Sequence, residues 1–268
     1  MKSLLEYIME REYFNPDVDV NILQPILQTV SEGGILGDTE VNYINSLIHG
    51  SFSVHVIDGI IAGYLFSKRF GLGKEPHDKI SIGDTERLVE LVRRIPVDRI
   101  QRFLGAGAEG FVLNIGNDMV VKMFFTDSDP IGMSWDLLFT IFENIQKENP
   151  GTLPKVYKVK RPYVIREAVK MNTPKCKKYF DTTQKVYTLP DGSKDDLMQI
   201  VYDYNESKIR KSLKTDIEIE VLDWLVKLRD EMENLGIVDN QGESCFGEDF
   251  KLSNIGETKD GRVVCFDF

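Results

Sequence analysis

Before residue 96, apolar residues recur at the three- and four-residue spacing of amphipathic helices. This spacing predicts four helices, at Ser3–Tyr13, Val20–Ser31, Thr39–His49 and Thr85–Arg94. No pattern of candidate catalytic side chains accompanies them. We therefore interpret residues 1–96 as a mostly helical domain that braces the rest of the protein or binds a partner protein.

From Ile100 onward, helical spacing gives way to short runs rich in β-branched and aromatic residues. The clearest runs are Phe111–Ile115, Met119–Phe125, Val156–Val159 and Tyr163–Ile165. The first two flank Gly116, Asn117 and Asp118, which are typical of a tight hairpin. With the strand before them, these runs predict a five-stranded sheet within residues 97–170.

Amphipathic helices accompany these strands. One is expected from Asp129 and Pro130 to Pro150, with an apolar stripe at Ile131, Trp135, Leu138, Phe142 and Ile145. Another begins at the capping-box pair Thr215 and Glu218 and ends at Gly236.

The remaining C-terminal segments carry weaker signals. Residues 172–214 are polar and predict a turn at Pro190-Asp191-Gly192 and a helix near Asp196–Tyr204, with little else that fixes a fold. The lysines at 175, 177 and 178 are interpreted as a solvated loop face. A small hairpin is expected around Asp260 and Gly261.

Composition narrows the class of protein. Apolar residues make up 42% and charged residues 28%, which is typical of a packed globular chain. The balance of 33 basic and 43 acidic residues disfavours binding to nucleic acid or to anionic membranes. The three cysteines and three histidines lack zinc-ligand spacing. With neither a secretory signal nor a membrane span in the pattern, we expect a cytoplasmic protein.

The segment LGAGAEGFV places Gly105, Gly107 and Gly110 in a GxGxxG arrangement. Glycines let the backbone approach a phosphate closely, but the same spacing also occurs in dinucleotide-binding folds and in ordinary turns. A dinucleotide-binding fold requires a helix directly after the glycines, whereas a strand and a hairpin are expected here. This order favours a loop that covers the phosphates of ATP.

Lys122 lies in the apolar run that follows the glycines. An ammonium group in an apolar strand requires a carboxylate or a phosphate to compensate its charge. A phosphate-binding role is favoured over the alternative, an edge lysine that reaches solvent. Its acidic partner is expected on the next helix, at Glu143 or, less favoured, at Glu148, although Glu143 can equally be a solvent-facing residue.

The C-terminal stretch places Asp249, Asn254 and Asp267 five and thirteen residues apart. One carboxylate can orient an attacking hydroxyl group. An amide oxygen and a second carboxylate, brought together by a short hairpin, can hold Mg²⁺ against nucleotide phosphates. This spacing predicts a phosphate-transfer site.

Together these motifs resemble the protein-kinase-like superfamily from Ile100 to Phe268. LGAGAEGFV is similar to its glycine-rich loop, VVK to its strand-lysine motif, EDFKLSN to its catalytic loop and DF to the start of its metal-binding motif. The resemblance implies an α+β, two-lobed fold with a β-rich nucleotide-binding lobe at 97–170 and a shortened helical lobe at 171–268. The helical domain at 1–96 would be an addition.

The resemblance also implies roles for individual residues. Asp249 would be the catalytic base, Asn254 and Asp267 would bind Mg²⁺, and Lys122 would pair with the α- and β-phosphates of ATP. Lys251 is similar to a lysine of serine/threonine kinases that contacts the γ-phosphate, which implies a protein hydroxyl as acceptor.

The adenine site is implied in the same way. The backbone of Glu167 and Val169 is similar to the segment that hydrogen-bonds adenine, and Val112 and Val120 would form the roof of the adenine pocket. The chain departs from the family at Gly247 and Glu248 before the catalytic aspartate, at Gly256 in place of an apolar pocket floor, and at the gatekeeper residue Arg166.

The expected function is therefore transfer of the γ-phosphoryl group of ATP, with Mg²⁺, to a serine or threonine of a protein substrate. Two alternatives stay open: a pseudokinase or nucleotide-binding interaction module, and a small-molecule kinase. The family pattern continues past the DF pair, so the sequence is either a fragment or a compact kinase-like protein. The stretches GTLPKVYKV and YVIREAV resemble compact bacteriophage kinases, which would place a phage-encoded chain in the host cytoplasm.

Overall fold

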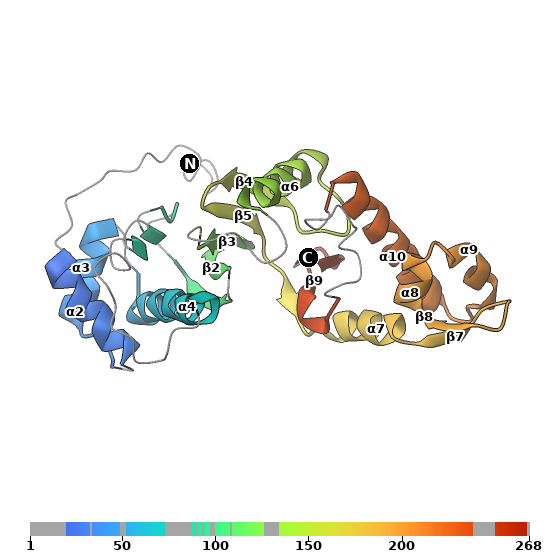
Figure 1. The fold of residues 1–268 in the computed structure, drawn as a ribbon, viewed down its shortest axis with the longest axis horizontal. Helices are drawn as coiled ribbons and strands as arrows, with labels where there is room; N and C mark the ends of the chain where they lie inside the picture. The colour runs from blue at the N-terminus through green and yellow to red at the C-terminus, as the bar shows by residue number, and fades with distance from the viewer. Residues whose placement is uncertain are drawn as a thin grey trace. The chain divides into compact units, whose positions relative to one another are not determined.

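The computed structural model describes residues 20–32, 34–48, 52–72, 87–88, 91–92, 94–96, 100–107, 109–125, 134–237 and 250–266. The predicted helix at Ser3–Tyr13 lies outside the described residues. The fold is mixed α and β, as the sequence predicts. The chain divides into two compact units, residues 1–130 with 157–166 and residues 131–156 with 167–268 (Figure 1).

Three helices open the first unit. Helices α2 (Val20–Ser31) and α3 (Asp38–Ile48) lie where the sequence predicts them, the second to within one residue. Helix α4 (Val54–Leu72) was not predicted, because β-branched residues and glycines lower the helix propensity of this segment. Of the predicted helix at Thr85–Arg94, residues 87–88 and 91–92 are described and are helical.

The predicted five-stranded sheet is confirmed, with the strand order β1-β2-β3-β5-β4. Its strands are β1 (Arg102–Ala106), β2 (Gly110–Gly116), β3 (Met119–Phe124), β4 (Val156–Lys160) and β5 (Tyr163–Glu167). Both β1–β2 and β2–β3 are antiparallel pairs. Asn117 and Asp118 form the tight turn between β2 and β3 with positive φ angles, as the hairpin signal predicts.

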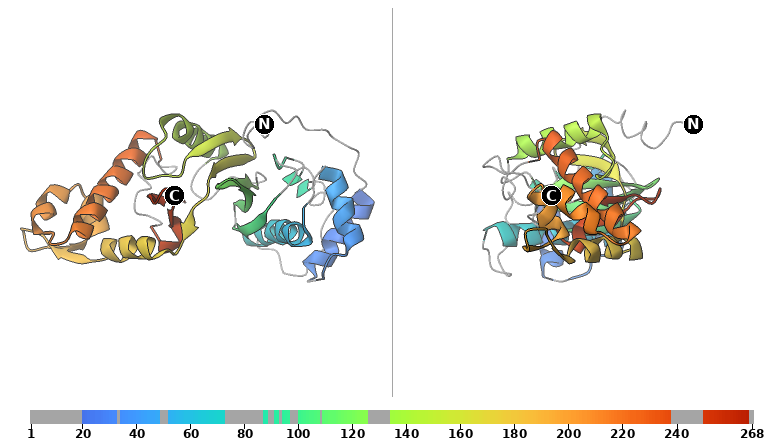
Figure 2. Two further views of the ribbon diagram at one scale, coloured as in Figure 1. Left: turned by 180° about the vertical axis from the view of Figure 1, so that it is seen from behind. Right: turned by 90° about the vertical axis from the view of Figure 1, so that its right-hand side faces the viewer.

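One hydrophobic core joins the helices of the first unit to one face of this sheet. Alternate residues of β2 and β3 contribute to it, namely Phe111, Leu113, Ile115, Met119, Val121 and Met123. Helix α4 packs against β1 and β2 (Figure 2). A methyl group on Gly59 would meet the Phe103 ring at 2.6 Å, and one on Gly63 would meet the Ala106 Cβ atom at 2.6 Å. Gly59 and Gly63 therefore allow α4 to approach β1 closely.

The second unit begins its described part with α6 (Trp135–Glu148). The predicted start at Asp129 and Pro130 lies outside the described residues. The helix instead begins after Ser134, whose hydroxyl accepts a hydrogen bond from the Leu137 amide at 3.3 Å. The described residues of the predicted stripe, Trp135, Leu138, Phe142 and Ile145, are buried.

The polar region 172–214 has more regular structure than its sequence suggests. It contains α7 (Pro174–Thr183), the hairpin β7 (Val186–Thr188) and β8 (Lys194–Asp196), α8 (Leu197–Tyr202), α9 (Glu206–Ile209) and the 3-10 helix η1 (Arg210–Ser212). The predicted turn and the predicted helix near residue 200 are confirmed as the β7–β8 connection and α8. The lysines at 175, 177 and 178 lie on helix α7 rather than on a loop.

Helix α10 (Asp216–Asn234) packs against α7 and α8 and carries the predicted capping box of Thr215 and Glu218. A three-stranded sheet completes this unit, with the order β10-β9-β6. Its strands are β6 (Lys170–Met171), β9 (Ile255–Glu257) and β10 (Val263–Cys265), and β9 and β10 form the predicted C-terminal hairpin. In the part of the chain that the structure describes, no helix is both long and apolar enough to cross a membrane.

Candidate functional site

The three glycines of the GxGxxG segment lie at the end of β1, in the following turn and at the start of β2, and their surroundings differ. The Gly107 amide donates a hydrogen bond to the Gly110 carbonyl at 2.8 Å, and the Phe125 amide donates one to the Glu109 carbonyl at 2.8 Å. A methyl group on Gly105 or Gly107 would have nothing within 4 Å, whereas one on Gly110 would lie 1.9 Å from the Met123 carbonyl oxygen. Gly110 is thus required by packing, while Gly105 and Gly107 border open space.

Gly105, Val112 and Lys122 lie in one row across three strands. The strand register pairs Gly105 with Val112, and Val112 with Lys122. Directly paired residues of an antiparallel sheet face the same side, and so does Val120, two residues before Lys122. This side is opposite to the face that packs into the core with the N-terminal helices. The structure therefore brings four of the expected nucleotide-binding residues to one face.

Lys122 has an acidic neighbour within the glycine turn. Its side chain is 15% exposed, and its Nζ atom lies 3.9 Å from Glu109 Oε2. The same atom lies 5.1 Å from the centroid of the Phe124 ring. Glu143 lies on the exposed side of α6, in the solvent-facing position that the sequence also allowed. Sequence reasoning missed Glu109, although it is the only acidic residue of LGAGAEGFV.

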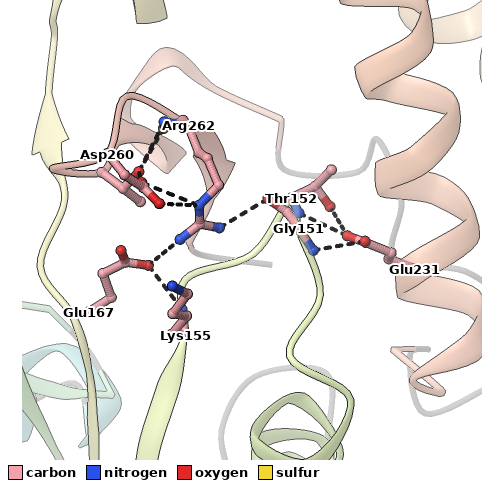
Figure 3. Close-up of polar contacts among 8 residues, drawn as sticks. Gly151, Thr152, Lys155, Glu167, Glu231, Asp260 and Arg262 are labelled. Carbon is pink, nitrogen blue, oxygen red and sulfur yellow. Dashed lines mark hydrogen bonds and ion pairs between the residues drawn. The ribbon is translucent and has the colours of Figure 1, made fainter.

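In the second unit, Glu167 at the end of β5 is fixed by both its backbone and its carboxylate. Its amide donates a hydrogen bond to the Lys155 carbonyl at 2.8 Å, and the Lys155 amide donates one to Glu167 Oε2 at 3.2 Å. The Arg262 Nη2 atom donates a third hydrogen bond to Glu167 Oε2 at 2.6 Å (Figure 3). The expected adenine-binding segment is therefore part of a polar network that the sequence did not predict.

Val169 packs on the backbone of Gly256 in strand β9. A methyl group on Gly256 would meet the Cβ and Cγ2 atoms of Val169, both at 2.6 Å. The side chain of Val169 thus occupies the space that a side chain at position 256 would need. Arg166, the unusual gatekeeper residue, is buried in β5.

Asn254 is buried at the end of the 3-10 helix η2 (Leu252–Asn254), directly before β9. The backbone N–H of Asn254 donates a hydrogen bond to the Lys251 carbonyl at 2.9 Å. The side-chain Oδ1 atom accepts one from the Ser253 hydroxyl at 3.1 Å. The Phe266 amide donates a hydrogen bond to the Asn254 carbonyl at 2.9 Å. The hairpin thus brings Phe266, the residue before Asp267, beside Asn254.

Asp249 and Asp267 lie outside the described residues, and Lys251 is exposed. Phe250, which follows Asp249, is held by aromatic contacts. Its ring stacks on Phe180 at 6.2 Å and contacts Trp224 at 6.0 Å between centroids. The Trp224 indole donates a hydrogen bond to the Val263 carbonyl at 2.9 Å, so α10 supports both this segment and the hairpin.

Of the two expected Mg²⁺ ligands, the described residues include Asn254. They contain no group of three or more histidine, cysteine, aspartate or glutamate side chains that could hold a metal ion. Mg²⁺ prefers oxygen ligands and commonly takes only one or two from the protein, with the rest from phosphates and water. The Asn254 amide oxygen fits that chemistry as one ligand, and the second expected ligand is Asp267.

No protein-family model matches the chain, and no curated protein matches it either.

Proposed function

We propose that the chain is an ATP-dependent phosphotransferase with a protein-kinase-like, two-lobed fold, and that it transfers a phosphoryl group to a serine or threonine hydroxyl of a protein. The observation that carries this proposal is the row formed by Gly105, Val112 and Lys122 across the sheet. A glycine with open space, an apolar side chain and an ammonium group lie side by side there. The glycine leaves room for the phosphates, the ammonium group can pair with their charge, and the apolar side chain can contact a planar base.

Four expected nucleotide-binding residues of the first unit would contact the phosphates and the base. Gly105 and Gly107 leave room for the phosphates because no atom of the described residues lies within 4 Å of a methyl group placed on either residue. Lys122 offers a positive charge in a largely desolvated position, where Coulomb attraction to phosphate is stronger than in water. Val112 and Val120 supply apolar contact for the base.

The remaining expected roles fall on residues of the second unit. The backbone of Glu167 and Val169 would hydrogen-bond the edge of adenine, and Lys251 would contact the γ-phosphate. Asn254 and Asp267 would hold Mg²⁺, which neutralises phosphate charge when it is bound. Asp249 would orient the acceptor hydroxyl. Positioning and charge neutralisation would then account for most of the rate enhancement.

The proposal is tested by incubating the purified chain with γ-labelled ATP and Mg²⁺, with a generic protein substrate or with a panel of hydroxyl-bearing metabolites and antibiotics. Label in protein supports the proposal. Label in small molecules alone would indicate a small-molecule kinase, and nucleotide binding without transfer would indicate an interaction module. Equal labelling by wild type and Asp249→Asn would exclude Asp249 as the catalytic base.

Replacing Glu109 with Gln is expected to strengthen ATP binding about three- to fivefold, which corresponds to at most ~1 kcal/mol. The reason is that the Glu109 carboxylate lies 3.9 Å from the Lys122 ammonium and would both compete with a phosphate for it and repel that phosphate. Titration calorimetry with ATP at fixed ionic strength measures the change.

The matched control is Asp118→Asn, which removes the same charge from the turn at the other end of β2. Its ATP affinity should equal that of wild type. An unchanged or weaker affinity in Glu109→Gln would show that this carboxylate does not compete with the nucleotide.

A further inference from the structure

Arg262 joins three segments of the second unit. It lies in the connection between β9 and β10, and its Nη2 atom donates to Glu167 Oε2 at 2.6 Å across 95 residues of sequence. Its Nη1 atom donates to the Gly151 carbonyl at 3.1 Å, and its Nε atom lies 3.2 Å from Asp260 Oδ2 (Figure 3). The three nitrogen atoms of this guanidinium group thus contact three different parts of the chain.

The ion pair between Arg262 and Glu167 is largely shielded from water. The side chain of Glu167 is 9% exposed and that of Arg262 is 26% exposed. Burial lowers the pKa of Arg262, but Glu167 and Asp260 raise that pKa by more. A hydrogen bond from the Thr258 hydroxyl and, to a smaller extent, one from the Arg262 guanidinium lower the pKa of Asp260 to about 2. Removing Arg262 would leave the Glu167 carboxylate buried without its charged partner, which is costly.

A second, independent set of contacts fastens the same segment to the same hairpin. The side chain of Val169 lies against the backbone of Gly256. Strand β6 follows directly and pairs with β9, Lys170 with Glu257 and Met171 with Gly256. Residues 167–171 are therefore attached to the hairpin through an ion pair, a close side-chain contact and strand pairing.

The other end of this hairpin holds Asn254. The Phe266 amide bonds to the Asn254 carbonyl at 2.9 Å, after β10 has run back alongside β9. One short hairpin thus contacts Glu167 through Arg262 near its turn and Asn254 at its base. A segment expected to read the base and a residue expected to hold the metal are attached to the same rigid element.

We infer that Arg262 is a positioning residue that holds the backbone of Glu167 to Val169 in the geometry that recognises the base of the nucleotide. This inference rests on the proposed function. Arg262 acts through the Glu167 side chain and contacts no reacting group. Its loss should therefore weaken recognition of the base and leave recognition of the phosphates unchanged. A lysine ammonium cannot reproduce the simultaneous contacts of the guanidinium group to Glu167, Gly151 and Asp260, so Arg262→Lys should give an intermediate effect.

The test measures the affinity of Arg262→Met and Arg262→Lys for ATP, GTP and inorganic tripolyphosphate with Mg²⁺. We expect Arg262→Met to bind ATP about tenfold more weakly, the lower end of the loss seen when a hydrogen-bonding partner behind a metal ligand is removed. The preference for ATP over GTP should fall in parallel, and tripolyphosphate affinity should match that of wild type. Hydrogen exchange of residues 166–171 should become faster in both variants.

The matched control is Glu231→Gln, which removes another arm of the same network. Glu231 on α10 accepts hydrogen bonds from the amides of Gly151 and Thr152, at 2.8 and 2.9 Å, without contacting Glu167 (Figure 3). This variant should keep the ATP preference of wild type even if it lowers the melting temperature. Should Arg262→Met fail to fold, Arg262→Lys and Glu167→Gln carry the same comparison.

The possible outcomes separate this inference from the proposed function. Nucleotide binding by wild type, with an unchanged ATP preference in the Arg262 variants, would overturn the inference alone. Equal weakening of all three ligands in Arg262→Met and Glu231→Gln would also overturn it, because it would indicate a general structural role. A wild-type chain that binds no nucleotide would overturn both.

Discussion

Replacing Lys122 with Met is expected to lower phosphoryl transfer from ATP by at least ~100-fold, the usual effect of removing one group that stabilises developing charge. Methionine is unbranched and close to lysine in length, so it should fit beside Val112 and Phe124 on the sheet. The fold should survive, because the ion pair that is lost, at 3.9 Å to a partly exposed Glu109, contributes at most ~1 kcal/mol.

Initial rates of label transfer, measured at saturating and limiting ATP, separate a loss of binding from a loss of catalysis. Lys158→Met is the matched control, because it removes another lysine from the same sheet, on the far edge strand β4. Its rate should equal that of wild type. Full activity in Lys122→Met would exclude Lys122 from the site, and equal losses in both variants would indicate general damage to the sheet.

Substitution of two glycines of the same motif should affect different properties, the stability of the fold at Gly110 and the binding of ATP at Gly105. Gly110→Ala is expected to destabilise the fold by on the order of 3 kcal/mol, because the new methyl group would lie 1.9 Å from the Met123 carbonyl oxygen and backbone would have to move. Gly105→Val should change stability by less than ~0.5 kcal/mol, because open space surrounds this position. It should nevertheless prevent ATP binding, because the valine side chain would stand on the face that carries Val112 and Lys122.

Urea unfolding of both variants, together with ATP titration of Gly105→Val, measures these effects. A Gly110→Ala variant as stable as wild type would show that the turn relaxes easily around the new methyl group. If Gly105→Val binds ATP normally, the nucleotide does not lie along the row of Gly105, Val112 and Lys122.

The elements that the sequence predicts well are those with local signals. Helix α10 has a capping box at Thr215 and Glu218 at its start, and the β2–β3 turn has Asn117 and Asp118 in left-handed conformations. Helix α4 was missed because its glycines, which lower helix propensity, serve its packing on β1. Helix α7 does have a local signal, Thr173 as N-cap followed by Pro174, but its polar composition hid it.

The contacts of the candidate site also differ in whether a local sequence signal specifies them. The hairpin of β2 and β3 could be predicted from its turn residues, whereas the pairing of Gly105 with Val112 follows a register shift in β1 that no local pattern specifies. The bond between Arg262 and Glu167 could not be predicted either, because no local pattern specifies a contact across 95 residues. Glu109 of the adjacent turn lies 3.9 Å from Lys122, a neighbour that no sequence pattern indicated.

Successive residues of β2 and β3 face opposite sides of the sheet. Odd-numbered positions, such as Phe111, Leu113, Val121 and Met123, belong to the core, and even-numbered positions face the other side. A single-residue deletion inside β2 would therefore exchange the two faces for the residues on one side of the deletion, turning core side chains toward the face that carries Lys122. The spacing between the glycines and Lys122 is consequently as strict a requirement of this molecule as the identity of the residues.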